Sequence, residues 1–364
     1  MAVTPEEAAE AMFDRQVRHR IDLERYAAGE VTRLLRFIRA MERDTLARIA
    51  ALKAAGEDLT RAERLRVQSL EGLLREVRLI YAEGYQRLRA GAFDSMEELA
   101  QFEAEFTTGS LARALDDLES IGSLAAKSVV AAAGAQVQTP TVAQLRAVIR
   151  SRPLMTDTKA GLLSAWFDDL GRAGIDRVES ALRISFAEGE SIATARERLR
   201  GIWSLNARSA EAVIRTAFNH VSTEVAQESY AANPELVNEV EWVSTLDSRT
   251  TPICRARDGK RFPVDSGPRP PAHIRCRSTV IPVVEGLPTP PRLTFGQWLA
   301  KQSADVQDDI LGPERGKLFR SGGLKVDQFT GRDGAPLTLA QIRDRYPEAF
   351  NRSGARRPPT PRRA

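Results

Sequence analysis

Apolar and polar positions alternate with the period of an α-helix over the first third of the chain. Apolar residues recur every three to five positions in three stretches, 31–52, 70–88 and 94–118, and the third contains Gly109. This spacing places one apolar stripe on each helix, and such stripes are buried only against one another or against a partner chain. We therefore expect three helices, with a break at Gly109, that form a bundle or an extended hairpin.

Beyond this helical arm the pattern predicts shorter helices. Prolines and glycines, which favour helix ends, separate segments with helical spacing. These segments cover residues 142–149, 162–170, 178–187 and 192–199. An alanine-rich run over residues 124–137 precedes them. It either marks the boundary between the arm and the following domain or forms a weakly packed helix.

A further helix is expected over residues 206–233, and one side of it is polar. Polar residues at intervals of three and four lie on one side of a helix. They are Arg215, Thr216, Asn219, His220 and Thr223. This polar side either faces solvent or supports the loop that follows in the sequence.

Two β-rich segments, 239–244 and 278–284, enclose a turn-rich loop. We expect them to form two strands of a hairpin-like unit that packs against the preceding helix. The loop between them holds both cysteines of the chain and one of its three histidines. The predicted fold class is therefore α+β and predominantly helical. A long N-terminal helical arm or bundle is followed by a compact α+β domain with a small β-hairpin or sheet and an elaborated Cys/His loop.

The composition is that of an ordinary globular protein, with 42% hydrophobic and 28% charged residues over 364 positions. Two cysteines are too few for the disulfide framework of a small secreted protein. We find neither a signal-peptide pattern nor an apolar run of about eighteen residues. We therefore expect a chain that is made and kept in the cytosol, or in an assembly formed there, without membrane contact.

The charge is mildly basic, with a formal net charge of +4 and a pI near 9.2. This balance permits contact with nucleic acid, although acids and bases are interleaved as on solvated helix faces. Segment 354–364 is rich in proline and contains no acid, and its arginines are Arg356, Arg357, Arg362 and Arg363. Such a tail either lies along DNA phosphates or an acidic patch of a partner, or is a disordered terminus without a partner.

The loop contains three candidate ligands for a zinc ion. His273 and Cys276 are three residues apart, a common spacing for two ligands of one ion, and Cys254 is a third candidate. Candidates for a fourth ligand are Asp247, Asp258 and Asp265. In the alternative interpretation, the cysteines pack as small apolar residues and the histidine lies at the surface.

A catalytic Cys-His pair is a second possibility for the same residues. The sequence supplies neither an oxyanion hole nor an orienting third group, so we do not expect catalytic residues here. A nuclease of the His-Asn-His kind would require more than the three histidines of this chain.

Several short motifs occur in a fixed order across the second half of the chain. Arg215-Thr216 on a helix is followed by WVSTLDSRT at 242–250, Cys254, Asp258-Gly259, and PPAHIRCR at 270–277. This series resembles the phage Mu F-like minor head protein family, also called the phage head morphogenesis domain. Besides the Cys/His residues, the matching motif positions are Arg215, Thr216, Trp242, Asp247, Arg249, Thr250, Asp258, Gly259 and Arg277.

The downstream segments FGQWL at 295–299 and LGP at 311–313 are similar to the tail that often follows this domain. With these segments the resemblance spans roughly residues 140–343. We therefore divide the chain into a helical arm over 1–138, the Mu F-like α+β domain over 139–285, a tail segment over 286–345 and a flexible basic tail over 346–364.

The resemblance implies a structural, non-enzymatic minor head protein of a tailed phage, a prophage or a phage-derived particle. It implies incorporation during procapsid assembly in the bacterial cytoplasm, a position inside the shell near the portal, and contacts with the portal protein, other head proteins and double-stranded DNA. The Cys/His positions of the family, suspected metal ligands, fall here on Cys254, His273 and Cys276. Family members often end this motif with Cys-Arg-Cys, whereas this chain has Ser278 at the last position.

Two alternatives to the head protein remain. The same loop could serve a metal- or cysteine-dependent enzyme acting on nucleic acid or on a cell wall. The chain could also be a DNA-binding protein outside any particle, in which case binding would be sensitive to salt and would require the arginine-rich tail.

Overall fold

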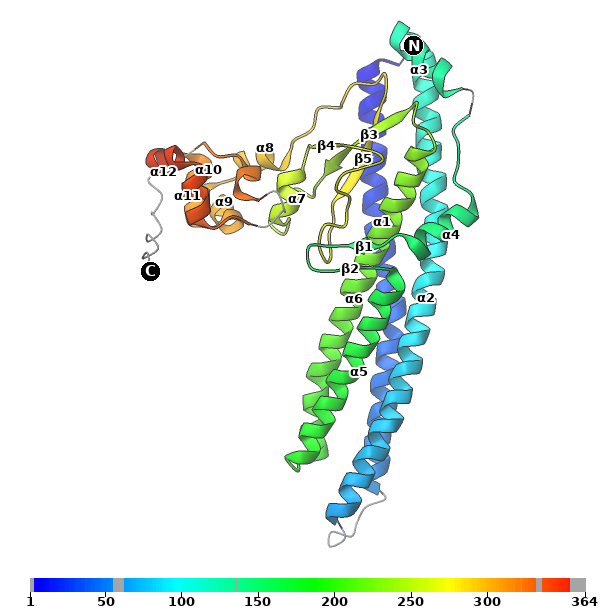
Figure 1. Ribbon diagram of the computed structural model, residues 1–364, viewed down its shortest axis with the longest axis vertical. Coiled ribbons are helices and arrows are strands. Elements are labelled where there is room, and N and C mark those ends of the chain that lie inside the picture. The colour runs from blue at the N-terminus through cyan, green and yellow to red at the C-terminus, as the bar shows by residue number, and fades with distance from the viewer. Residues whose placement is uncertain (1–2, 55–61, 135, 322, 332–335, 354–364) are drawn as a thin grey trace.

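Four long helices lie side by side and form an elongated bundle (Figure 1). The structure is a computed structural model that describes residues 3–54, 62–134, 136–321, 323–331 and 336–353. The bundle helices are α1 (Pro5–Ala54), α2 (Ala62–Ile121), α5 (Leu163–Ala187) and α6 (Ile192–Ala231). Helices α2 and α6 each contact the other three, so they form the central pair of the bundle.

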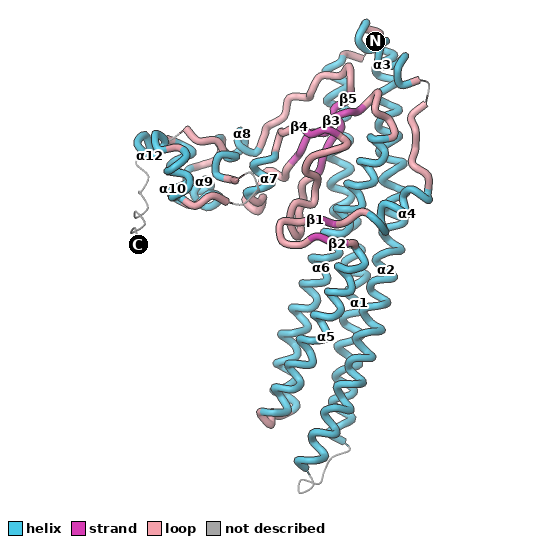
Figure 2. Tube along the Cα trace, in the orientation of Figure 1, coloured by secondary structure: helices cyan, strands magenta, loops and turns pink. Residues whose placement is uncertain are grey.

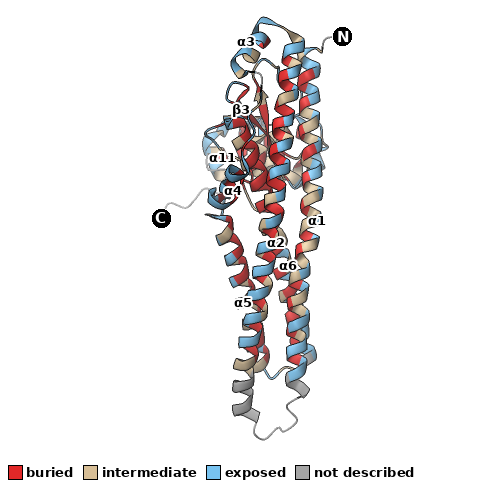
Figure 3. Cartoon of the chain, turned by 90° about the vertical axis from the view of Figure 1, so that its right-hand side faces the viewer, coloured by how far each residue is buried: buried red, intermediate tan, exposed pale blue. Residues whose placement is uncertain are grey.

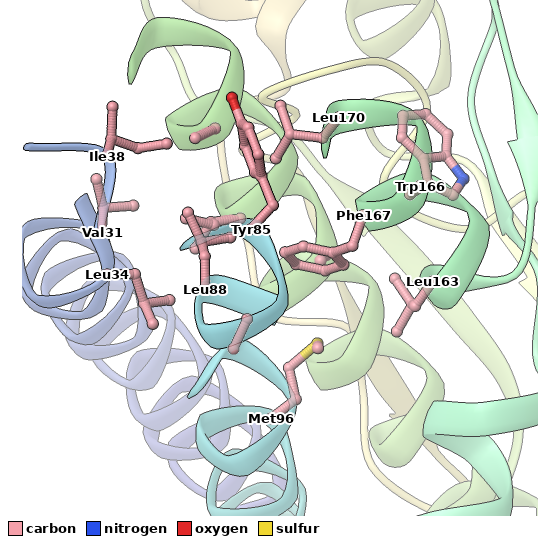
Figure 4. Packing of buried hydrophobic residues seen from close by; sticks show 14 of the residues in the cluster. Val31, Leu34, Ile38, Tyr85, Leu88, Met96, Leu163, Trp166, Phe167 and Leu170 are labelled. Carbon is pink, nitrogen blue, oxygen red and sulfur yellow. The ribbon is translucent and has the colours of Figure 1, made fainter. Parts of the chain in front are cut away.

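The apolar stripes predicted from the sequence face the interior of this bundle. Figure 3 shows buried residues on the inward sides of the long helices, and Figure 4 shows side chains of α1, α2 and α5 packed together. Examples are Leu34, Ile38, Leu88 and Phe167, all at most 3% exposed. The core continues from residue 23 to residue 225 and includes residues on both sides of position 138. The helical arm and the start of the following region therefore share one core.

The positions of the helix ends differ from the expectation at three places. Helix α2 runs through Gly109 without a break and joins the second and third predicted helices. Likewise, α5 joins the predicted segments 162–170 and 178–187, and α6 joins 192–199 to 206–233. The predicted breaks were therefore wrong.

The glycines in α5 are contact positions and not helix ends. A Cβ atom at Gly174 would lie 2.0 Å from the hydroxyl oxygen of Tyr85 on α2, and one at Gly171 would lie 3.3 Å from the Cβ of Tyr85. Glycine lets the two helices approach closely around the tyrosine ring, and this packing outweighs the low helix propensity of glycine.

Two short helices and a hairpin connect α2 to α5. They are α3 (Leu124–Ala133), α4 (Val142–Ser151) and the strands β1 (Leu154–Met155) and β2 (Ala160–Gly161), which pair antiparallel. The alanine-rich run thus contains a helix, which Ser123 caps by accepting a hydrogen bond from the Ala126 amide.

A three-stranded antiparallel sheet packs beside the upper part of the bundle (Figure 2). Its central strand is β3 (Val237–Val243), flanked by β4 (Arg261–Pro263) and β5 (Thr279–Val284). The two predicted strands therefore pair, and the loop between them contains α7 (Pro252–Arg257) and β4. The predicted fold class, predominantly helical α+β with a small sheet and a Cys/His loop, is confirmed.

A group of short helices follows the sheet and lies to one side of it (Figure 1). It comprises α8 (Phe295–Ala300), α9 (Ala304–Leu311), α10 (Pro313–Arg320), the 3-10 helix η1 (Val326–Phe329), α11 (Leu339–Arg345) and α12 (Pro347–Ser353). These helices bury an apolar cluster of their own. In the described part of the chain, no helix combines the length and apolar character needed to span a membrane. The four arginines of segment 354–364 lie outside the described residues.

The packing of Tyr85 on glycine predicts the effect of one methyl group. Gly174→Ala should lower the free energy of unfolding by about 1–3 kcal/mol because the methyl group collides with the tyrosine ring. Gly109→Ala is the matched control, since nothing lies within 4 Å of its added Cβ. It should raise stability by about 0.5–1 kcal/mol. Urea denaturation of both variants measures the difference, and equal effects would contradict the proposed contact.

Candidate metal centre

Three metal-binding side chains meet in the loop between β3 and β5. Cys254 lies on α7, and His273 and Cys276 lie between β4 and β5. The Sγ atom of Cys254 is 3.3 Å from Nε2 of His273 and 3.7 Å from Sγ of Cys276. Both cysteines are free thiols and are buried, whereas His273 is half-buried. All three ligand atoms lie within 4.8 Å of one another.

These distances fit a tetrahedral zinc ion. Zinc binds cysteine sulfur at about 2.3 Å, so two sulfurs in a tetrahedron lie about 3.8 Å apart. The ring orientation of His273 fits as well. Its Nδ1 atom is 2.9 Å from the carbonyl oxygen of Ile274, and because a carbonyl only accepts, Nδ1 carries the proton. In an ion-bound cluster Nε2 would then point its lone pair at the metal, as in sites where a second hydrogen bond orients a ligating histidine. Without an ion the same atom holds a proton that it donates to Cys276.

The hydrogen bonds within the cluster separate the pKa values of its thiols. The pKa of Cys254 is raised by its hydrogen bond to Cys276 and by burial. The pKa of Cys276 is held well below its ordinary value because it accepts hydrogen bonds from Cys254 and His273. Burial lowers the pKa of His273, but the hydrogen bond to Cys276 and the attraction between their charges raise it by more, so the pKa lies above its ordinary value. One thiolate is thus stabilised next to the other two ligands.

The aspartates considered as a fourth ligand are engaged elsewhere. Asp247 accepts two hydrogen bonds from Arg277, both at 2.7 Å, which lower the pKa of its carboxyl. Asp258 accepts bonds from the amides of Ser244 and Phe295, at 2.7 and 2.6 Å. Asp265 is exposed and bonds to its neighbour Ser266. Among the residues that the structure describes, the cluster therefore offers three ligands, and the fourth position of a tetrahedral ion would fall to water or another external group.

Helix α6 holds the segment that carries His273 and Cys276. The hydroxyl of Thr216 accepts a 2.9 Å hydrogen bond from the amide of Arg275, which has a left-handed φ of 58°. The amide of Asn219 donates to the carbonyl oxygen of Cys276 at 2.8 Å and to that of Ser278 at 3.4 Å. Part of the polar side of α6 thus supports the loop, as one of the two interpretations proposed.

The other polar residues of α6 have different partners. His220 is 3.3 Å from the carbonyl oxygen of Arg152, and burial lowers its pKa to about 4, so the ring is neutral near pH 7. Arg215 bonds to Glu211 at 2.9 Å. Thr223 is buried. These residues do not join the Cys/His cluster.

The remaining motif residues shape the loop around α7. Trp242 is fully buried and donates to the hydroxyl of Ser244, which in turn donates to the carbonyl oxygen of Cys254 at 2.9 Å. Gly259 has a φ of 78° and donates to the carbonyl oxygen of Trp242 at 2.9 Å. Thr250 bonds to the carbonyl oxygen of Thr245.

Arg249 is the exposed member of the motif. Its side chain is 79% exposed and its guanidinium lies 3.7 Å from Asp247, while its backbone amide donates to the same aspartate at 3.0 Å. The Arg249 side chain is therefore at the surface, whereas its sequence neighbour Thr250 is buried.

A buried arginine that the sequence did not single out joins this loop to the chain that follows the sheet. Arg292 bonds to Glu241 at 2.8 Å and to Asp258 at 3.4 Å, and all three side chains are at most 9% exposed. Arg292 also donates to the carbonyl oxygen of Trp242 at 3.0 Å. Glu241 inside strand β3 was the available signal in the sequence. A carboxylate that is buried in a sheet requires a positive partner, and Arg292 is that partner.

A family model described as Phage Mu protein F like protein matches residues 176–281. This segment begins within α5, ends within β5 and contains all three residues of the Cys/His cluster. The resemblance seen in the sequence motifs is therefore confirmed for this segment. The match implies a phage head morphogenesis protein, from a family of structural head proteins. Comparisons with curated proteins and with solved structures found no match.

The ligand geometry predicts that the chain binds a single zinc ion. Elemental analysis of protein purified from zinc-supplemented cells should find this ion, and Cys254→Ser, His273→Ala and Cys276→Ser should each lose it. Asp247→Asn is the control, because Asp247 pairs with Arg277 and lies outside the cluster. Loss of zinc from a folded Asp247→Asn variant would place this carboxylate among the ligands and overturn the assignment.

The buried ion pairs predict a large effect of replacing Arg292. Arg292→Met leaves Glu241 and Asp258 buried without their cation, so it should cost about 3–5 kcal/mol of unfolding free energy. Arg172→Met should cost less than about 1 kcal/mol, because Arg172 is 71% exposed and pairs with Asp169 at the surface of α5. Urea denaturation compares the two variants. A small effect for Arg292→Met would show that this pair does not anchor the loop.

Proposed function

We propose that this chain, which carries a Phage Mu F-like domain over residues 176–281, is a structural minor head protein of a tailed phage, a prophage or a phage-derived particle. The observation that carries the proposal is the family match to the segment that contains α6, the sheet and the pinned Cys/His loop. The protein acts in head morphogenesis. It is assembled in the bacterial cytoplasm and lies inside the shell near the portal.

The shape of the bundle supports a role between subunits of an assembly. Helix α2 has 60 residues and is therefore about 90 Å long. A helical rod of this length is about three times as long as a small domain is wide, and the compact sheet and loop beside its upper part form a rigid docking surface. The partners that we propose are the portal protein and other head proteins.

We propose separate tasks for the four segments of the chain. Segment 1–138 supplies the helical arm, although it shares its core with the following domain, 139–285. Segment 286–345 and α12 of segment 346–364 form the small helical group, and the arginines that follow α12 in the tail contact packaged DNA. Counter-ions released from DNA phosphates would favour that contact.

The metal centre has a structural task in this proposal. It would join α7 to the segment before β5 and thereby fix a loop that has few regular elements. The enzymatic alternative draws on the open fourth position, because catalytic zinc sites also use three protein ligands. The variants of Cys254 and His273 separate these roles. If the centre is structural, a variant that lacks Cys254 or His273 should fail to fold or to assemble. If the chain is an enzyme, the same variant should fold and assemble but lose activity.

The proposed location is tested by mass spectrometry of purified particles. Empty procapsids, filled heads and the soluble fraction of producing cells are compared, with the major capsid protein as the internal standard. We expect this chain in procapsids and filled heads at a few copies relative to the major capsid protein. Its recovery only from the soluble fraction would contradict a head protein of any kind.

A further inference from the structure

A cavity of about 470 Å³ lies between α1, α6 and the loop segment 273–277. Its volume falls in the range of small-molecule sites, about 300–1,000 Å³. Five arginines from three separate parts of the chain line it, namely Arg20, Arg215, Arg249, Arg275 and Arg277. The loop of the Cys/His cluster forms one wall, but the cavity extends beyond the cluster to the N-terminal helix.

The charges around this cavity do not cancel. Two glutamates line it, and Asp247 behind Arg277 is a third acid. Glu24 bonds to Arg20 at 2.5 Å, and Glu211 bonds to Arg215 at 2.9 Å. Five arginines therefore face three carboxylates. His273 and Cys276 also line the cavity, and as an ionised pair they cancel each other, so two positive charges are left in excess. An arginine cluster held in a concave site selects anions.

Donors remain available on the open side of the cavity. Each guanidinium has five N–H groups in a fixed fork. Arg275 uses one terminal nitrogen, Nη2, for the carbonyl oxygen of Arg208 and for Glu211. Arg249 has its nearest carboxylate at 3.7 Å and is mostly exposed. Both side chains can turn donors toward a ligand without breaking a buried ion pair.

Apolar side chains also line the cavity. Leu23, Leu99 and Phe218 line it, and Phe218 is 3% exposed. A site lined by both arginines and apolar side chains suits an organic anion better than a fully hydrated inorganic ion. The forked donors of arginine match the oxygens of a phosphate group in particular.

We propose that this arginine-lined cavity binds a phosphate group carried by a nucleotide or by the 5′ end of a DNA strand. Glu211 limits the affinity, because it occupies donors of Arg215 and Arg275. The site does not depend on the proposed role in the head, and it is separate from the arginine-rich tail.

Calorimetric titration of the full chain tests the site with four probes. They are inorganic phosphate, adenosine 5′-monophosphate, and one oligonucleotide with either a 5′-phosphate or a 5′-hydroxyl. We expect the monophosphate to bind more tightly than inorganic phosphate, and the phosphorylated oligonucleotide more tightly than its hydroxyl partner. Both oligonucleotides carry the same internal phosphates, so binding by the arginine-rich tail contributes equally to both. The difference between their affinities therefore reports the 5′-phosphate alone. Equal binding of the pair, together with no binding of the monophosphate, would overturn the proposal.

Substitutions of opposite sign separate binding from a general loss of structure. The double variant Arg249→Gln, Arg275→Gln should lower the affinity for the monophosphate at least about tenfold. Glu211→Gln should raise that affinity. Arg200→Gln is the control, because Arg200 lies on α6 outside the cavity and pairs with Glu197 at the surface. If Glu211→Gln weakens binding, or if the double variant binds like the unchanged chain, the cavity is not the phosphate site.

Discussion

The hydrogen bonds between α6 and the loop backbone are the constraint on which the rest of this structure depends. Thr216 and Asn219 hold the amide of Arg275 and the carbonyl oxygen of Cys276, so a rigid helix sets the position of an irregular segment. Once this segment is fixed, Cys276 and His273 face Cys254, and Arg275 and Arg277 face the cavity beside α1. The metal centre and the cationic cavity are therefore two faces of one pinned loop.

The loop is held from its other end by buried charge. Asp258 and Glu241 are removed from water, and this is tolerated because Arg292 pairs with both carboxylates and backbone amides donate further hydrogen bonds to Asp258. Such a set is sensitive to the loss of any member. It also connects the sheet to the chain that leads into the small helical group, since Arg292 lies in that connection.

The sequence predicted those features that depend on local spacing. The apolar stripes of α1 and α2, the two strands of the loop and the grouping of the two cysteines with His273 all follow from patterns within a short stretch. The break predicted within α5 was wrong because the glycines there, Gly171 and Gly174, were taken as helix ends. Only the ring of Tyr85, some ninety residues away along the chain, explains why glycine is needed there.

Features that join distant segments were not predictable in this way. Arg20 bonds to Asn219 across 199 positions, and Arg292 bonds to Glu241 across 51. In each case one partner looks like an ordinary surface charge in the sequence, and only the packed fold brings the second partner near. The aspartates near the cluster were ambiguous for a related reason, because a carboxylate can serve a metal, an arginine or a backbone amide equally well.

The core that α1 and α2 share with α5 and α6 has a consequence for how the chain is made. The ribosome completes α2 at residue 121 and α6 only at residue 231. At about 5–20 residues per second, this interval lasts on the order of 5–20 seconds. During that time the first two helices lack the complete set of partners that covers their apolar faces in the finished bundle. The nascent hairpin is therefore the stage of synthesis at which chaperone binding or premature self-association has the most surface to act on.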